Sequence, residues 1–320
     1  MKAYTDNPLA SVIVPNYNHS KYLPERLSSI INQSFQDFEL IILDDASTDN
    51  SLEIISGCIG NLPHRLIANK ENSGSPFKQW DKGISLAKGE LIWIAESDDV
   101  AEPTLLEKAV RKLLDSETVF AYCQSLIIDS DDNVTGNVKG WTDEYDPILW
   151  NNDFIMDGVK FCSNFLAIKC VIPNASAVVF RRKFYINPLT ILPHLTLAGD
   201  YLFWAHLAMQ GSVAYIAEPL NKFRRHGSTA RVSRGGQITL RKPLMLRHGS
   251  LRKLMPMARG LLLILYGAIC LIYGPVSAWN PRRRLIGFRE KRPMRSCISC
   301  TGSAFSLLYY RISQRALLEY

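Results

Sequence analysis

Two adjacent carboxylates follow a short apolar run in this sequence, and their chemistry suits a divalent cation. Asp98 and Asp99 come shortly after the run Ile92–Ala95. Adjacent carboxylates are hard oxygen ligands of the kind that Mg²⁺ or Mn²⁺ takes, and such an ion can bridge phosphate oxygens. A solvated turn that caps a helix before Pro103 would use the same residues. The pair alone leaves a metal site and a capped turn both open.

A second acidic pair and an aromatic residue follow two other apolar runs. Asp44 and Asp45 end the run 38–43. A carboxylate there could accept the imide N–H of uracil or a ribose hydroxyl, or it could cap the next helix. Tyr17 follows Pro15 at the end of the first run, where its ring could stack on a base or pack against neighbours. These positions are candidates for nucleotide contacts.

Two further clusters lie later in the chain and suit proton transfer and anion binding. Asp200 is surrounded by apolar residues within the segment 199–204, and a partly buried helix start raises the basicity of a carboxylate. An ordinary helix cap is the alternative. Arg224, Arg225 and His226 form a cationic cluster that suits a diphosphate, and a neutral histidine can also bind a metal. A solvated basic loop would have the same composition.

The elements that must position these residues alternate between strand and helix periodicity. Strands are predicted at residues 11–15, 38–43, 65–68, 90–95, 119–128, 175–180 and 213–216. Helices are predicted at residues 22–33, 51–58, 76–88, 103–115 and 200–210. This alternation predicts a doubly wound, mostly parallel but mixed sheet with helices on both faces, of the α/β class. Ligands of such sheets bind beyond the carboxyl ends of the strands, where both acidic pairs fall.

Several common classes are disfavoured by composition and motifs. With 320 residues, of which 47% are hydrophobic and 21% charged, the composition disfavours a disordered, collagen-like or coiled-coil chain. No G-x-G-x-x-G follows the first strand and no P-loop occurs, which disfavours a dinucleotide site and a P-loop nucleotide site. The seven cysteines are odd in number and scattered, and no signal peptide is expected, so we predict a reducing, cytoplasmic setting. Cys297 and Cys300 are interpreted as ordinary thiols rather than a metal or redox site.

Five segments, taken in order, resemble a known enzyme family. They are SVIVPNYNHSKYLPERLSSIINQSFQDFELIILDDASTDNS, NSGSPFKQWDKGISLAKGELIWIAESDD, IPNASAVVFRR, GDYLFWAHLA and FRRHGS. Together they resemble family 2 glycosyltransferases, which have the GT-A fold, invert the anomeric centre and use nucleotide sugars. The resemblance covers about residues 9–228.

The resemblance implies a position for the nucleotide. It puts Pro15 and Tyr17 beside the base, Asp45 in contact with the base, and Asp98 in contact with the ribose. A UDP-type donor is expected, with a thymine or guanine nucleotide left open.

The resemblance also implies a metal site and a phosphate site. Asp99 would bind Mg²⁺ or Mn²⁺ as the last acid of the motif, which reads E-S-D-D here, so that Glu96 departs from the usual first aspartate. His226 would reach the metal or the diphosphate, and Arg225 would contact the diphosphate.

The resemblance implies that Asp200 is the catalytic base, although Gly199 stands where many members carry a second acid. Lys78 and Lys82 would steer the phosphates. The implied reaction is an in-line displacement in which Asp200 takes the proton of an acceptor hydroxyl. The expected acceptor is a saccharide or lipid-linked saccharide, in bacterial cell-surface polysaccharide synthesis.

Two other functions remain open. A nucleotidyltransferase of similar sheet topology would lack a base at Asp200, and it would carry a glycine-rich basic loop where this chain has Asn16–Asn18. A nucleotide-sugar-binding or membrane scaffold module with a lapsed site is the non-enzyme alternative. The retention of Asp45, Asp99 and Asp200 argues against it.

The net charge of +7 is an average over two unlike regions. Residues 1–221 contain 17 basic and 28 acidic side chains, whereas residues 222–320 contain 20 basic and 2 acidic ones. We predict a catalytic domain at 1–228 and a basic C-terminal region at 229–320.

The basic region contains an uncharged 20-residue run at 260–279, flanked by Arg and Lys on both sides. Because both flanks are basic, an in-plane or re-entrant membrane helix is favoured over a single span. A peripheral or monotopic location at the inner face of the cell membrane, against anionic lipid, is therefore expected. A buried helix of a small subdomain, or a tail altered at the coding level, would also fit. Nucleic acid is not expected as a partner, because aromatic residues are not interleaved with the arginines.

Overall fold

The computed structural model describes residues 7–60, 62–115, 117–143, 145–167, 169–187 and 199–227. The region 229–320, with the predicted membrane helix at 260–279, lies outside the described residues, and the domain division at residue 228 stays a prediction. Contacts divide the chain into Met1–Phe161 with Cys170–Gly236, and Cys162–Lys169 with Gln237–Tyr320. The sheet and the candidate site lie in the first of these units. Within the described ranges, no helix combines the length and apolar character needed to cross a membrane.

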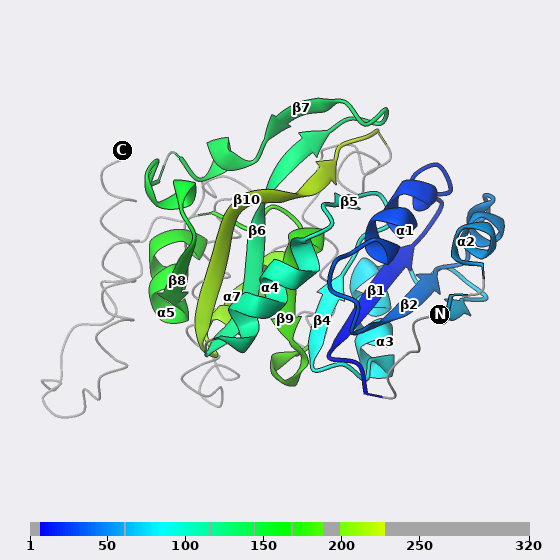
Figure 1. Ribbon diagram of the computed structural model, residues 1–320, viewed down its shortest axis with the longest axis horizontal. Coiled ribbons are helices and arrows are strands. Elements are labelled where there is room, and N and C mark those ends of the chain that lie inside the picture. Colours follow the sequence, from blue (N-terminus) through cyan, green and yellow to red (C-terminus); the bar gives the residue numbers. More distant parts are fainter. Residues whose placement is uncertain are drawn as a thin grey trace, which may run out of the picture. The chain divides into compact units, whose positions relative to one another are not determined.

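One mixed sheet forms the framework of this unit (Figure 1). Its strands are β1 (Ala10–Asn16), β2 (Phe38–Asp44), β3 (Arg65–Ala68), β4 (Leu91–Ile94), β5 (Val100–Ala101), β6 (Thr118–Ile128), β7 (Val134–Asn137), β8 (Phe154–Asp157), β9 (Val178–Arg181) and β10 (Ser212–Arg224). The order is β3-β2-β1-β4-β9-β6-β10-β5, with β7 paired to β6 and β8 paired to β10. Strands β1 to β4 are mutually parallel, β9 is antiparallel to both neighbours, and β10 is parallel to β6. The predicted doubly wound α/β class is confirmed.

Helices cover both faces of the sheet (Figure 1). The longer helices are α1 (Leu23–Ile31), α2 (Ser51–Ile59), α3 (Pro76–Leu86), α4 (Leu105–Leu114) and α7 (Gly199–Ala208). The short ones are α5 (Gly158–Phe161), η1 (Lys139–Trp141), η2 (Leu149–Asn151), η4 (Ala175–Ala177) and η5 (Arg182–Phe184), with the π-helix η3 (Cys162–Leu166) in the second unit. Because strands β1, β2 and β4 are buried on both faces, they are continuously apolar rather than alternating.

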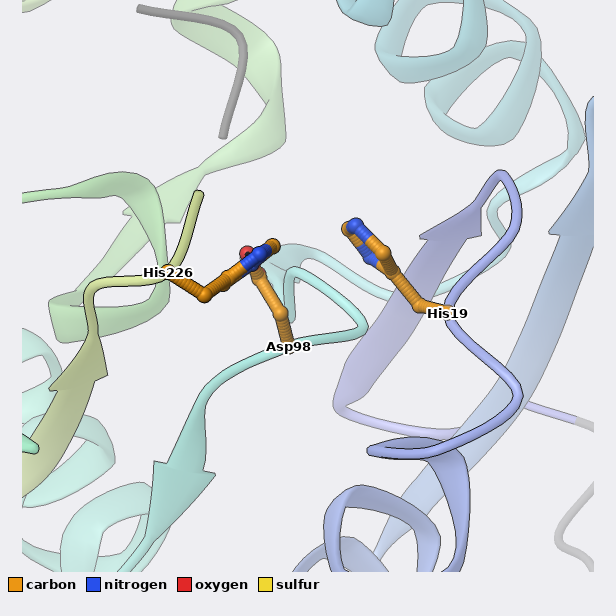
Figure 2. A group of neighbouring side chains, drawn as sticks. All are labelled: His19, Asp98 and His226. Atoms are coloured by element: carbon orange, nitrogen blue, oxygen red, sulfur yellow. Dashed lines mark hydrogen bonds and ion pairs between the residues drawn. The ribbon is translucent and has the colours of Figure 1, made fainter. Parts of the chain in front are cut away.

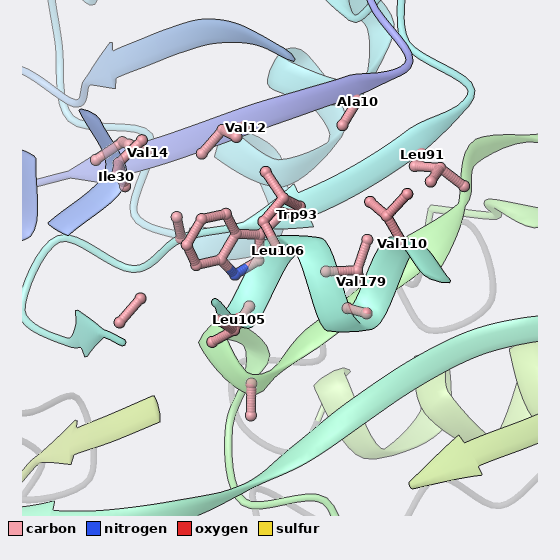
Figure 3. Close-up of a cluster of buried hydrophobic side chains, with 14 of the residues drawn as sticks. Ala10, Val12, Val14, Ile30, Leu91, Trp93, Leu105, Leu106, Val110 and Val179 are labelled. Atoms are coloured by element: carbon pink, nitrogen blue, oxygen red, sulfur yellow. The ribbon is translucent and has the colours of Figure 1, made fainter. Parts of the chain in front are cut away.

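The core on one face lies under helices α1, α2 and α4 (Figure 3). Trp93 of β4 occupies its centre, and Val12 of β1 lies beside it in register. Helix α1 contributes Leu23 and Leu27, whose spacing places them on one helical stripe. The packing of these side chains holds β1 and β4 in place, and with them the loops that follow these two strands.

The opposite face is covered by α3 and α7. Helix α3 approaches β1 so closely that a Cβ on Gly83 would lie 2.4 Å from Cγ2 of Ile13. Trp80 of α3 has ring contacts with Phe203 and Trp204 of α7, at centroid distances of 6.2 Å each. This aromatic cluster joins the helix that carries Asp200 to the half of the sheet that carries the acidic pairs.

The largest difference from the predicted elements concerns β10. It was predicted to end at Ile216, but it continues to Arg224 and pairs with β6 across irregularities around Pro219. Between β6 and β9, β7, β8 and several short helices add to the predicted elements. The longer β10 carries the following loop, with His226, to the carboxyl edge of the sheet.

Candidate functional site

The carboxyl ends of β1, β2 and β4 meet at one edge of the sheet, as expected for parallel strands. Asn16 is in register with Asp44, and Asp45 donates its backbone N–H to the Asn16 carbonyl at 2.8 Å. The loops after β1 and β2 are tied together, since the Asn18 amide oxygen accepts from the Thr48 backbone N–H at 2.7 Å. The predicted nucleotide-binding positions therefore share one rigid edge.

Three ligand-type side chains converge at this edge (Figure 2). His19 comes from the turn after β1, Asp98 from the turn after β4, and His226 from the loop after β10. One ligand atom of each lies within 4.8 Å of the others, and they are the only such group found in the described ranges of the chain. Nε2 of His226 is 3.0 Å from Oδ2 of Asp98. We call these three residues the His–Asp–His cluster.

Neighbouring side chains hold the cluster in place. The ring of Tyr22 lies 5.9 Å from the His19 ring and 4.9 Å from the His226 ring, and Nδ1 of His19 is 2.8 Å from the Ser97 hydroxyl. Arg224 donates from Nε to the Asp98 carbonyl at 2.7 Å. Both imidazoles and the Asp98 turn are therefore pre-positioned before any ligand binds.

Electrostatics make Asp98 the ionised member of the acidic pair. Burial acts to raise the pKa of Asp98, but the hydrogen bond with His226 and the charges of the two histidines outweigh it and lower that pKa. Burial lowers the pKa of His19 despite the attraction of Asp98, and His226 adds to the lowering. A carboxylate beside an imidazole that loses its proton readily is a suitable cation site.

Asp99 is placed differently from its neighbour, and its predicted metal role stays a prediction. Its side chain is 2% exposed; Oδ2 accepts from Asn174 at 2.7 Å and Oδ1 accepts from the Arg224 backbone N–H at 2.9 Å. Burial and the charge of Asp98 raise the pKa of Asp99 to about 7. Asp99 anchors the turn to β10, whereas Asp98 faces the two histidines.

The remaining acid of the motif, Glu96, is held by α3. The indole N–H of Trp80 donates to Oε1 of Glu96 at 2.8 Å, and the Ser176 hydroxyl is 3.1 Å from the Glu96 backbone N–H that donates to it. Burial and the charge of Asp98 raise the pKa of Glu96 to about 8. Beneath the turn lies the fully buried Arg26, stacked 5.0 Å from the Trp93 ring centroid.

Asp45 lies in a ring of hydrogen-bond donors. Its Oδ1 accepts from Asn69 at 2.6 Å, from the Ser73 backbone N–H at 2.9 Å and from Gln79 at 2.8 Å, while Oδ2 accepts from the Ser73 hydroxyl at 2.7 Å. These donors come from the loop after β3 and from α3. Asp45 is therefore fixed in direction without a cation.

The other predicted nucleotide contacts lie at the end of β1 and at the loop around Asp45. Tyr17 is 45% exposed, so its ring is available to a ligand, whereas Pro15 is buried within β1 opposite Leu43. Lys78 donates to the Ser73 carbonyl at 3.0 Å, and Lys82 donates to Asn69. The structure thus brings both lysines to the Asp45 loop, and their predicted role in steering the phosphates stays a prediction.

Arg225 lies next to the His–Asp–His cluster in the chain and is exposed. Its guanidinium is 5.3 Å from the Trp141 ring centroid and 5.7 Å from that of Phe223, and its backbone N–H donates to Ile128 at 2.8 Å. A cation held by two rings at this edge is positioned for an anionic ligand.

Asp200 lies in the first turn of α7, as predicted, and is half-buried. Its Oδ1 accepts the backbone N–H of the next residue, Tyr201, at 2.9 Å, whereas an N-cap would accept from a residue two or three positions further on. Three residues later, Phe203 packs on Trp80, whose indole holds Glu96. Asp200 and the acidic turn are therefore joined through one buried tryptophan.

Sequence reasoning missed His19 and Trp80. His19 follows a strand end within PNYNHSKYL, so its position beyond the first strand was the available signal. Trp80 has only the apolar spacing of a core residue on α3, and nothing in that pattern distinguishes a tryptophan that also donates to an acid.

A mixed sheet with carboxylates and imidazoles at its carboxyl edge defines an α/β protein that binds its ligand beyond the strand ends. The model of glycosyl transferase family 2 matches residues 11–185, and the chain belongs to that family. An uncharacterized glycosyltransferase of Haemophilus influenzae is 30% identical over 225 residues, which cover 69% of this chain and 67% of that protein.

Other relatives match over shorter stretches. Glycosyltransferase GlyG of Streptococcus pneumoniae is 35% identical over 161 residues, and the matched part spans about half of each chain, 50% of this one and 48% of GlyG. Chondroitin synthase of Pasteurella multocida is 33% identical over 135 residues, which are 14% of that protein. The crystal structure of S. aureus TarS 1–349 in complex with UDP matches with a TM-score of 0.52 and 20% identity, covering 68% of this chain and 61% of TarS 1–349. The shared fold is thus the GT-A fold predicted from the motifs.

Proposed function

We propose that this protein transfers a sugar from a UDP-type nucleotide sugar to a hydroxyl group of a saccharide or lipid-linked acceptor, with inversion. The observation that carries the proposal is the meeting of Asp45 and the His–Asp–His cluster at one sheet edge. A carboxylate at the end of β2 suits a base, and a cation site at the end of β4 suits a diphosphate. The relatives include a chondroitin synthase and a hyaluronan synthase, and the structural neighbour TarS 1–349 was crystallised in complex with UDP, which supports the same role here.

The donor side uses residues with different tasks. Tyr17 offers an exposed ring face to the base, and Asp45 offers the free acceptor capacity of its carboxylate to the imide N–H. Arg225 lies beside the cluster and contacts the diphosphate. These groups bind and orient the donor, and they hold its anomeric carbon toward α7.

The residues present fit a divalent cation. Two imidazoles and one carboxylate, with ligand atoms within 4.8 Å, need only small side-chain movements to enclose an ion. We assign the cation to Asp98 and His226 rather than to Asp99, because Asp98 faces both imidazoles whereas Asp99 faces Asn174 and the Arg224 backbone. A bound Mn²⁺ or Mg²⁺ would supply positive charge where negative charge develops on the leaving diphosphate.

Asp200 supplies the base. It accepts the proton of the acceptor hydroxyl while that oxygen forms a bond to the anomeric carbon. The bond between this carbon and the diphosphate oxygen breaks on the opposite face, and its electron pair leaves with the nucleotide.

The test compares donor binding with donor turnover in Asp200→Asn. UDP binding is measured by thermal shift with Mn²⁺, and turnover by UDP release from a panel of UDP-sugars. We expect unchanged UDP binding and a loss of turnover of about 100-fold or more, which is the usual contribution of a positioned base.

Asp157→Asn is the matched control, because Asp157 also accepts a backbone N–H at a helix start, from Lys160 at 2.9 Å. It should leave turnover unchanged. Full turnover in Asp200→Asn would refute the base assignment, and the absence of binding to any nucleoside diphosphate would refute the proposed function.

We also propose that the basic C-terminal region binds the inner face of the cell membrane. Its support is sequence alone: 20 basic side chains against 2 acidic ones in residues 222–320, and the uncharged run at 260–279. The full chain should pellet with anionic liposomes and not with neutral ones. Equal pelleting by a chain that ends at residue 228 would refute this role.

A further inference from the structure

His19 is a member of the His–Asp–His cluster that the predicted site did not include. Its imidazole reaches the cluster from the turn after β1, and its ring centroid lies 5.4 Å from that of His226. A ring nitrogen of His19 lies within 4.8 Å of the ligand atoms of Asp98 and His226. The contact between Nδ1 and the Ser97 hydroxyl fixes the orientation of the ring.

We propose that His19 is a third protein ligand of the cation, and that the resulting set of two imidazoles and one carboxylate binds a transition ion in preference to Mg²⁺. This inference rests on the proposed function, because it concerns the same cation site. Imidazole nitrogen is a borderline ligand that suits Zn²⁺, Co²⁺ and related ions, whereas Mg²⁺ takes oxygen ligands and keeps several of its waters. A site with one imidazole and one carboxylate would discriminate less.

The geometry supports three metal ligands rather than an ion pair of Asp98 and His226 with His19 only nearby. Nε2 of His226 and Oδ2 of Asp98 are already 3.0 Å apart, a separation that two ligands of one ion can have. His19 faces the same carboxylate from the opposite side in Figure 2. A proton can be shared between Asp98 and only one imidazole at a time, whereas a single metal ion can bind all three.

The surroundings also resemble the support that metal ligands require. A ligating imidazole is normally oriented through its other contacts, and here Ser97 and Tyr22 orient the His19 ring. Ser97 is 2% exposed and belongs to the same turn as Asp98, so the two ligands move together. A cation held by these three side chains would still have room for oxygens of the diphosphate.

The first measurement is metal affinity without substrate, using Mn²⁺ and Mg²⁺ alone. Free Mn²⁺ is followed by electron paramagnetic resonance, and Mg²⁺ binding is measured by its competition with Mn²⁺. The wild type should bind Mn²⁺ at least about 10-fold more tightly than Mg²⁺. His19→Gln should weaken Mn²⁺ binding by about 10-fold or more and reduce the preference over Mg²⁺.

His64→Gln is the matched control, because His64 lies just before β3, at the amino end of the sheet. Its Nδ1 is 2.8 Å from the backbone carbonyl of Leu62. It should leave both affinities unchanged. Wild-type Mn²⁺ affinity in His19→Gln, with loss of affinity in Asp98→Asn, would overturn the third ligand and leave the proposed function standing. Absence of both Mn²⁺ and UDP binding in the wild type would overturn both proposals.

A second variant gives a direct spectroscopic readout that a structural role of His19 would not produce. In His19→Cys, a thiolate at this position should give a sulfur-to-Co²⁺ charge-transfer band when Co²⁺ is added, and should increase affinity for Cd²⁺ relative to Mn²⁺. A Co²⁺ spectrum without this band, from a variant that melts at the wild-type temperature, would also overturn the inference.

Discussion

Asp45 and Asp98 lie at the ends of two parallel strands of one sheet edge, yet their surroundings are opposite. Asp45 accepts four hydrogen bonds from Asn69, Ser73 and Gln79, all of which are neutral donors. Asp98 faces two imidazoles and is flanked by two more acids of its own turn. The first carboxylate accepts its hydrogen bonds from neutral groups of the protein, whereas the second is ionised beside two imidazoles.

The different surroundings of Asp45 and Asp98 suit them to different parts of a nucleotide sugar. A carboxylate fixed by amides and a hydroxyl has one direction left for a ligand, which suits the recognition of a flat base. A carboxylate among imidazoles binds a cation whatever the shape of the rest of the ligand, which suits a diphosphate that carries a metal ion. The two halves of a nucleotide sugar are therefore matched by two kinds of acid, on one rigid edge.

The largest expected effect is the loss of Mn²⁺ affinity when Asp98 is changed. Asp98→Asn should weaken Mn²⁺ binding by about 100-fold or more, because it removes the only carboxylate ligand of the cluster. Asp45→Asn should leave Mn²⁺ binding unchanged and weaken UDP binding by about 10-fold, the effect of one charge-assisted hydrogen bond. Isothermal titration with Mn²⁺, and then with UDP, separates the two.

Asp99→Asn is the matched control for Asp98, since it changes the adjacent carboxylate to the same amide. Because Asp99 accepts bonds from Asn174 and the Arg224 backbone, this variant should melt at a lower temperature while it keeps its Mn²⁺ affinity. The opposite pattern, with Mn²⁺ binding lost in Asp99→Asn and kept in Asp98→Asn, would restore the assignment expected from the motif.

The smallest expected effect concerns the crowding of acids around Asp98. Glu96 and Asp99 have pKa values raised to about 8 and about 7, so the metal-free folded protein holds protons that the unfolded chain releases near pH 4. The free energy of unfolding should therefore fall as the pH rises from about 5 to 8. Glu96→Gln removes one of the two groups and should make this fall about half as steep.

Urea unfolding at several pH values, without metal, measures this slope. Glu71→Gln, a change at an exposed glutamate, is the control and should keep the wild-type slope. A slope in Glu96→Gln equal to that of the wild type would show that the pKa of Glu96 is not raised in the folded protein.

The strands and helices of the amino-terminal half could be predicted because their patterns are local. The runs at β1, β2 and β4 are apolar without interruption, and the polar residues that follow them mark the ligand edge. The far end of β10 could not be predicted, because Glu218 and Pro219 interrupt its pattern and its pairing with β6 is long-range. The presence of the site was thus evident from sequence, but its last contributing strand was not.

The division of labour between Asp98 and Asp99 also lay beyond sequence. Adjacent carboxylates carry the same chemical signal, and only the direction of the turn decides which one is buried against Asn174 and which one faces the histidines. The motif resemblance ranked them by position, whereas the structure distinguishes them by their hydrogen-bond partners. His19 was missed for a related reason, since a turn residue has no periodicity that shows which way its ring points.

The most direct test of the account is to locate the cation. Crystals grown with Mn²⁺ and UDP, measured at the manganese absorption edge, give the position of the ion from anomalous scattering alone. The account predicts the strongest peak between Asp98 and His226, with His19 on its third side. A peak bound to Asp99 and away from both histidines would contradict it.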